Sequence, residues 1–164
     1  MAAAKLRGLS EIRQHFYRNE TPIYHVDVTN FNLMGIDEWV RRFRYINYND
    51  CFDGLHGNIR VPPRELPAVY PFKRLEELNN YLLTRPSIQE YIRERGPGKA
   101  VFLYFDERTL EICEDLNLTV IFPPLSLRRE FDSKISGTRL ANEVGVACVP
   151  NVLGPVADYD SLLA

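Results

Sequence analysis

Two spacings of apolar residues recur along the chain, and each predicts a type of secondary structure. The segment 22–28, PIYHVDV, is rich in β-branched and aromatic residues, which predicts a strand. The continuous apolar run KAVFLYF (99–105) is typical of a strand that is buried on both faces of a sheet. A further strand is expected in LTVIFPP (118–124), where two prolines end it. These three segments are the predicted strands of a sheet.

Helical spacing marks much of the chain between these strands. Apolar residues three and four apart predict a short helix at 9–17 and a longer one at 36–46, which Asp37 can cap. Residues 72–95 predict two consecutive helices, with a proline in the first turn of the second. Glycine, asparagine and proline signals crowd residues 47–71, so a long loop or short edge strands are expected there.

The fold class follows from the unit at 99–124. The segment DERTLEICEDLN (106–117) predicts a helix capped by Asp106, and it lies between two predicted strands. A strand, a helix and a strand in this order form a crossover that requires parallel strands and right-handed winding. The sequence therefore predicts an α/β fold with a mostly parallel sheet flanked by helices.

Composition limits the function classes. The chain has 164 residues, and its formal net charge of −2 gives no general attraction to nucleic acids or anionic membranes, so any anion site must be local. Its three cysteines form no CxxC pair, which favours neither a disulfide framework nor a zinc site. No segment approaches the roughly 18 apolar residues of a membrane span. A cytoplasmic protein without a membrane partner is the simplest interpretation.

Polar residues follow two of the predicted strands. In parallel α/β sheets, ligands bind outside the carboxyl ends of the strands. Asp27, Thr29, Asn30 and Asn32 lie at such an end, and Asp106 lies at another, so all five are candidates for a substrate cleft. The alternative is local turn and capping chemistry, which is the more common role of these residue types.

Two further groups of polar residues are weaker candidates, one for acid–base catalysis and one for a metal site. His25 and Asp27 share one face of a strand, but a strand histidine is more often a hydrogen-bonded core residue than an acid or base. Asp50, Asp53 and His56 recur at three-residue intervals, but the adjacent glycines favour a turn-rich loop over a metal site.

Arginines and aromatic residues interleave at 39–48. Arg41, Arg42 and Arg44 alternate with Phe43 and neighbouring aromatics, a composition also found on single-stranded nucleic-acid platforms. The alternative is an amphipathic helix that runs into a strand, with arginines outward. The negative net charge favours this alternative, so a nucleic-acid partner is not expected. An exposed surface of this kind also suits a protein interface.

The segment 122–151, FPPLSLRREFDSKISGTRLANEVGVACVPN, combines a strand ending in proline, a short helix, an Asp-x-Lys start, and a helix ending in Glu-x-Gly-Val before Val-Pro-Asn. It resembles the junction of ATP-grasp enzymes, especially the biotin-carboxylase-like and carbamoyl-phosphate-synthetase-like members, where the pre-ATP-grasp domain meets the nucleotide-binding domain. In that family the lysine at this position contacts the phosphates of ATP, so the resemblance implies this role for Lys134. The family often has Asp directly before Lys, whereas Ser133 stands between Asp132 and Lys134 here.

The resemblance implies a Rossmann-like pre-ATP-grasp domain over residues 1–124, with linker helices and the start of an ATP-grasp domain over residues 125–164. The parent enzyme would use ATP and Mg²⁺ to activate a small carboxylate substrate as an acyl phosphate, as a ligase or carboxylase-like enzyme does. This part would form some of the substrate cleft and one side of the ATP site, and it could pair two copies.

The other nucleotide and metal ligands of the family lie in the rest of the ATP-grasp domain, beyond residue 164. The resemblance therefore implies no catalytic residue, no metal ligand and no tightly bound ATP in this chain. The alternative is a stand-alone, non-catalytic α/β module for binding or protein interaction.

Overall fold

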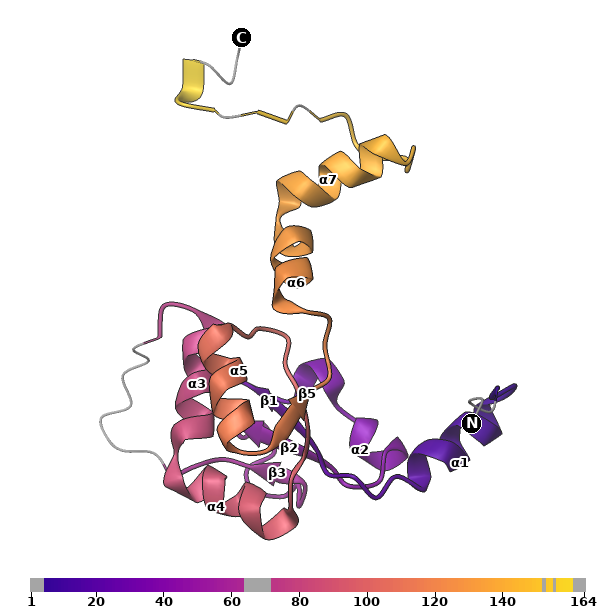
Figure 1. Ribbon diagram of the computed structural model, residues 1–164, viewed down its shortest axis with the longest axis vertical. Helices are drawn as coiled ribbons and strands as arrows, with labels where there is room; N and C mark the ends of the chain where they lie inside the picture. Colours follow the sequence, from indigo (N-terminus) through magenta and orange to yellow (C-terminus); the bar gives the residue numbers. More distant parts are fainter. Residues whose placement is uncertain (1–4, 64–71, 152, 155, 161–164) are drawn as a thin grey trace. The chain divides into compact units, whose positions relative to one another are not determined.

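The computed structural model describes residues 5–63, 72–151, 153–154 and 156–160 (Figure 1). It divides the chain into two compact units, Met1–Phe122 and Pro123–Ala164, two residues before the boundary that the sequence predicts. The first unit is an α/β domain, and the second includes the helices Leu125–Asp132 and Lys134–Glu143. The two units are described separately.

The first unit is built on a sheet of five parallel strands, in the order β3-β2-β1-β4-β5. The predicted parallel α/β class is therefore confirmed, and the fold is Rossmann-like. The direction of strand succession reverses between β1 and β4, and such a switch point is where ligands bind in these folds. The strands are β1 (Ile23–Asp27), β2 (Phe43–Asn47), β3 (Ile59–Arg60), β4 (Gly98–Val101) and β5 (Leu118–Val120).

Most predicted helices are present. The predictions at 9–17, 72–95 and 107–117 are confirmed, and β4, α5 and β5 form the predicted parallel crossover. The helices of the first unit are α1 (Leu9–Tyr17), η1 (Phe31–Leu33), α2 (Ile36–Trp39), α3 (Leu75–Thr84), α4 (Pro86–Arg95) and α5 (Glu107–Asp115). The second unit contains α6 (Leu125–Asp132) and α7 (Lys134–Glu143).

The long helix predicted at 36–46 is wrong, because the chain turns after Trp39 and residues 43–47 form β2. Arg42 has a left-handed backbone with a φ of 64°, which no helix continues through. Its guanidinium donates to the carbonyl oxygen of Glu20 at 2.8 Å and so holds this turn in place. The alternative from the sequence, a helix that runs into a strand, is the one that the structure has.

The strands present alternate residues to two differently covered faces. Tyr24 is paired with Arg44, and its ring lies 6.5 Å from that of Tyr91 in α4, so α4 covers this face. On the other face, Tyr45 packs with Val40 in a cluster that includes residues of β1, β2, β3 and η1. Figure 1 shows α3, α4 and α5 together on one side of the sheet, with α2 on the other.

The core lies mainly under α3 and α4. Leu78, Leu82, Ile88 and Ile92 are buried on the helix faces that the sequence pattern predicts. They pack with Val26, Ile46, Ala100 and Phe102 among the fully buried residues of the sheet side.

At the start of the sheet, β1 and β4 approach each other closely. The N–H of Lys99 donates to the carbonyl oxygen of Pro22 at 2.9 Å, and Gly98 lies against the same carbonyl. A Cβ atom at Gly98 would lie far inside van der Waals distance of that oxygen. The glycine is therefore required by the close approach of the two strands.

No helix within the described ranges is long and apolar enough to cross a lipid bilayer. Cys113 is buried in α5, whereas Cys51 and Cys148 are exposed, and all three are free.

Candidate functional site

The first candidate site is the carboxyl edge, defined here as the carboxyl ends of β1, β2 and β4 with the loops that follow them. Asp27 ends β1 and is almost completely buried. One of its carboxylate oxygens accepts from the N–H of Val28 at 2.7 Å, and the other accepts from the amide of Asn32 at 3.0 Å. The amide of Asn47, at the end of β2, donates to the carbonyl oxygen of Asp27 at 3.2 Å.

A second group at this edge surrounds Asp106, which caps α5. Its carboxylate accepts from the N–H of Thr109 at 2.9 Å and from the amide of Asn80 in α3 at 3.0 Å. The Thr109 hydroxyl oxygen accepts in turn from the N–H of Asp106, which completes a capping box. Burial alone raises the pKa of the Asp106 carboxyl, but hydrogen bonds from Asn80 and Thr109 and the charge of Arg74 outweigh it and lower the pKa below its ordinary 3.8.

Several buried amide atoms near this edge have no hydrogen-bond partner in the described part of the chain. Both side-chain polar atoms of Asn30 are in this state, although the residue is only 1% exposed. The side-chain oxygens of Asn47 and Asn79 also lack partners, while the Asn79 amide nitrogen donates to the carbonyl oxygen of Tyr104 at 2.7 Å. Such groups are costly unless a ligand or water satisfies them, which makes this edge a candidate for binding a polar molecule.

The predicted cleft residues divide between these two groups. Asp27 and Asn32 are brought together by a direct hydrogen bond, whereas Asp106 bonds to α3 and to its own helix. Asn30 is buried, and Thr29 is half-buried. The hydrogen bonds of Asp27 and Asp106 are largely of the turn and capping kind that the sequence suggested as the alternative.

The amides of Asn47, Asn79 and Asn80 were missed by sequence reasoning. Asn47 could have been found, because it ends β2 as Asp27 ends β1, but the wrong helix at 36–46 hid this strand end. Asn79 and Asn80 belong to a helix whose apolar spacing gives no sign that two polar residues point at the sheet. Their position depends on how α3 packs.

His25 is a buried core residue, as the sequence favoured. Its Nε2 lies 3.8 Å from a carboxylate oxygen of Asp27, but neither ring nitrogen has a hydrogen-bond partner within the described residues. The expected hydrogen bonding of this core histidine is therefore wrong. Burial lowers the pKa of His25, against a smaller opposite effect of the Asp27 charge, so the ring stays neutral.

The loop with Asp50, Asp53 and His56 forms turns. The carboxylate of Asp50 accepts from the N–H groups of Phe52 and Gly54, and His56 Nε2 lies 3.4 Å from Asp37. No group of three or more His, Cys, Asp or Glu side chains among the described residues could hold a metal ion. The turns that Asp50 holds are the turn-rich structure that the glycines predict for this loop.

Lys134 belongs to the second unit. It is the first residue of α7 and is exposed. Ser133 is the N-cap, and its hydroxyl accepts from the N–H of Ser136 at 3.3 Å. Asp132 ends α6 and pairs with Arg128 at 2.9 Å. A cation at a helix N-terminus opposes the helix dipole, so Lys134 adds positive charge where the dipole already favours an anion.

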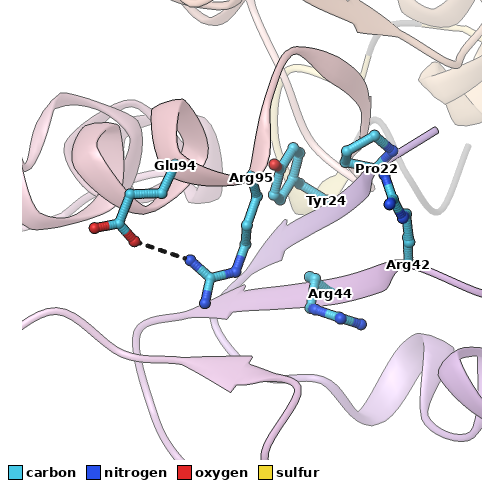
Figure 2. Close-up of a pocket in the computed structure, with 6 residues that line it drawn as sticks. All are labelled: Pro22, Tyr24, Arg42, Arg44, Glu94 and Arg95. Atoms are coloured by element: carbon cyan, nitrogen blue, oxygen red, sulfur yellow. Dashed lines mark hydrogen bonds and ion pairs between the residues drawn. The ribbon is translucent and has the colours of Figure 1, made fainter. Parts of the chain in front are cut away.

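A second concave site lies at the amino edge, defined here as the amino ends of β1, β2 and β4 with the end of α4. It has a volume of about 290 Å³. Figure 2 shows it between the last residues of α4 and the β1–β2 pair. We call it the arginine pocket, and its lining residues are Pro22, Tyr24, Arg42, Arg44, Glu94 and Arg95.

Comparisons of this chain with protein-family models, with curated proteins and with solved structures found no match. The class of the first unit is therefore given by its own topology, a Rossmann-like α/β domain with a switch point between β1 and β4.

Proposed function

We propose that this chain is the N-terminal part of an ATP-grasp ligase or carboxylase-like enzyme, with a pre-ATP-grasp domain followed by the first helices of the nucleotide-binding domain. The observation that carries the proposal is the order of elements around Lys134. A parallel crossover ends in β5, two prolines follow at 123–124, and two helices come next, the second of which begins at Lys134. The same segment carries the resemblance to the ATP-grasp junction.

The division of the chain supports this proposal. The sheet domain ends at Phe122, and α6 and α7 belong to a different compact unit. Apolar side chains of this second unit are exposed, among them Phe131, Ile135 and Val144 at 52–65%. Exposed apolar side chains at this density need a protein surface to cover them, and the remainder of an ATP-grasp domain would supply one.

Lys134 fits the phosphate side of a nucleotide site. It is exposed, it begins a helix of ten residues, and its neighbour Ser133 caps that helix without adding a negative charge. Mg-ATP would supply the phosphoryl group that activates a carboxylate substrate. Lys134 would hold the phosphates by charge and hydrogen bonding, and the carboxyl edge would contribute polar groups to the substrate cleft.

The carboxyl edge is suited to orienting a neutral or hydroxylated part of the substrate rather than its carboxylate. Its buried unpartnered atoms are amide groups of Asn30, Asn47 and Asn79, which carry no net charge. The two carboxylates present, Asp27 and Asp106, already accept hydrogen bonds and would repel a second carboxylate.

The first test is the reading frame of the gene. The proposal expects it to continue past codon 164 into a region with a second phosphate-binding lysine and Glu and Asn metal ligands. A stop codon directly after Ala164 would instead support the stand-alone binding module.

The second test is nucleotide binding by the full-length protein. Lys134→Ala should raise the Kd for Mg-ATP by about tenfold or more, because a hydrogen bond to a charged group contributes roughly 1.5–3 kcal/mol. Isothermal titration calorimetry with the wild type and with Arg139→Ala, an exposed cation on the same helix, provides the comparison. Equal affinity of Lys134→Ala and Arg139→Ala would return Lys134 to an ordinary surface lysine. Sub-micromolar ATP affinity of the 164-residue chain alone would also contradict the proposal.

A further inference from the structure

The arginine pocket is assembled by strand register. Tyr24 on β1 is paired with Arg44 on β2, and Ile46, two residues further along β2, is paired with Arg60 on β3. Paired residues and residues two apart share a face of the sheet, so Arg44 and Arg60 project on the same side as Tyr24. This is the face that α4 covers.

The end of α4 adds the opposite wall. The guanidinium of Arg95 lies 3.8 Å from the centroid of the Tyr91 ring, and that of Arg60 lies 5.7 Å from it. A second hollow of about 140 Å³ is lined by Arg60, Ser87, Glu90 and Tyr91 and shares Glu94 and Arg95 with the arginine pocket. The two hollows are therefore neighbours, and the Glu90 carboxylate lines the second one alone.

Only some of these cations have a structural role. Arg42 pairs with Glu20 at 3.3 Å, and Arg95 pairs with Glu94 at 3.2 Å. Arg95 also donates to the Tyr91 carbonyl oxygen at 3.4 Å, which is the expected use of a cation at the C-terminus of a helix.

Arg44 and Arg60 remain without such a role. Arg44 donates to the carbonyl oxygen of Phe43 at 2.8 Å, and Arg60 lies against Tyr91, but neither pairs with a carboxylate in the described ranges. Arg44 is half-buried, so its charge is poorly solvated. Arg44 in the arginine pocket and Arg60 in the neighbouring hollow are thus two guanidinium groups without a carboxylate partner in the described ranges, which favours an anion beside them.

The floor of the pocket is rigid. The hydroxyl of Tyr24 donates to the carbonyl oxygen of Gly96 at 3.1 Å, which ties β1 to the end of α4. Burial, with a smaller effect of Tyr91, raises the pKa of Tyr24 to about 12, so this hydroxyl stays protonated and adds no negative charge. The pocket thus exists before any ligand arrives.

We propose that the arginine pocket binds the phosphate group of a small molecule. Arg44 is the guanidinium of this pocket without a carboxylate partner among the described residues, and Arg60 lies in the hollow beside it, so the local charge suits a phosphate monoester, about −1.5 to −2 at neutral pH. Phosphate offers several acceptor oxygens to arginines that come from different elements, here Arg44 of β2 and Arg95 of α4, with Arg42 just before β2. The volume of about 290 Å³ lies at the lower end of small-molecule sites, which excludes a large ligand as a fully enclosed guest.

This proposal does not rest on the proposed ATP-grasp function. The pocket lies at the amino edge, whereas the predicted substrate cleft lies at the carboxyl edge and Lys134 lies in the other unit. Phosphate binding that depends on Arg44 but is unchanged in Lys134→Ala therefore reports on this pocket alone.

The experiment is a calorimetric titration of the 164-residue chain with inorganic phosphate, inorganic pyrophosphate and citrate. The wild type should bind pyrophosphate saturably, and Arg44→Gln and Arg60→Gln should each raise the Kd about tenfold. Arg108→Gln, which removes an exposed arginine on α5 outside both hollows, should leave the Kd unchanged. Arg60 is exposed, so Arg60→Gln should not disturb folding. This variant therefore still tests the proposal if Arg44→Gln folds poorly.

Three outcomes would overturn the proposal. The first is no saturable binding of phosphate or pyrophosphate by the wild type. The second is equal weakening by Arg108→Gln, which would mean attraction to the surface in general. The third is an Arg44-dependent preference for citrate, which would make the pocket a carboxylate site.

Discussion

The two edges of the sheet hold their polar groups in different ways. At the carboxyl edge, Asp27 and Asp106 accept hydrogen bonds from neighbouring N–H and amide groups, and several asparagine atoms are buried without partners. At the amino edge, the polar groups are guanidinium groups: Arg95 lies over an aromatic ring and pairs with Glu94, Arg42 pairs with Glu20, and Arg44 donates to a backbone carbonyl oxygen. One edge is therefore acidic and rich in amides, and the other is cationic.

This difference shows how a chain with a net charge of −2 can hold a local anion site. The amino edge collects cations from β2, β3 and α4, which are far apart in the sequence. The carboxyl edge combines Asp27 and Asn47 at strand ends, which parallel sheets place there by topology, with Asn79 and Asn80 from α3. Its strand-end residues can thus be anticipated from strand positions, whereas its helix residues depend on packing and the amino edge depends on the strand register.

The largest expected effect is at the amino edge, where β1 and β4 meet. Gly98→Ala should lower the free energy of unfolding by about 3 kcal/mol, because its Cβ would force Pro22 away from β4. Urea unfolding followed by circular dichroism measures this loss. Gly57→Ala, where nothing lies within 4 Å of the new methyl group, is the control and should stay near the wild type. If the two variants were equally stable, the strands would not be tightly apposed at this edge.

The second largest expected effect on stability concerns His25, which lies in β1 between the two edges. His25 stays neutral in the folded state because its pKa is lowered, whereas in the unfolded chain it takes up a proton near its ordinary 6.5. The free energy of unfolding therefore keeps the full contribution of neutral His25 above pH 6.5. It loses this contribution as the pH falls from 6.5 toward the lowered pKa of the folded state. The limit for one proton is about 1.4 kcal/mol per pH unit below pH 6.5.

His25→Leu should remove this slope and keep the stability at neutral pH, since neither ring nitrogen has a partner to lose among the described residues. Urea unfolding at several pH values measures the slope. His15→Leu, at an exposed position of α1, should keep the wild-type slope. A wild-type slope in His25→Leu would mean that this histidine is protonated in the core.

The smallest effect is at the carboxyl edge. Asp106→Ala should cost about 1 kcal/mol, the usual value for a helix N-cap, because it removes the acceptor for Thr109 and Asn80. Its lowered pKa means that this stabilisation is present above pH 3.8 and is lost as the pH falls through the lower folded value. Thermal unfolding of Asp106→Ala against Asp115→Ala, at the other end of α5, measures the difference. Equal melting temperatures of the two variants would mean that the Asp106 cap does not stabilise the carboxyl edge.

Much of the fold could be predicted from local patterns. The capping box at Asp106 and the parallel crossover from β4 to β5 depend on residues close in sequence, so the sequence indicates them directly. The segment 43–47 was harder, because Phe43, Tyr45 and Asn47 alternate with Arg44 and Ile46 over only five residues, too few to distinguish a strand from a helix end. The left-handed backbone of Arg42 separates the helix from this strand, and the residue types around it do not predict that conformation.

The candidate sites follow the same division. Asp27, Asn30 and Asp106 could be found because they stand directly beside strand ends. The pairing of Arg44 with Tyr24, and the approach of Arg60 and Arg95 to one ring, depend on the registers of β1, β2 and β3 and on the packing of α4. These are long-range properties that spacing in one segment does not contain.

The cap of α7 changes the charge balance at the start of that helix. A hydroxyl from Ser133 does the capping, and the carboxylate of Asp132 pairs with Arg128 one turn back along α6. A carboxylate at the cap would offset the charge of Lys134 next to it. With a neutral cap, the lysine keeps its full charge at the helix start, and an arriving anion meets no competing negative group in that position. Ser133 thus sets the electrostatics at the start of α7.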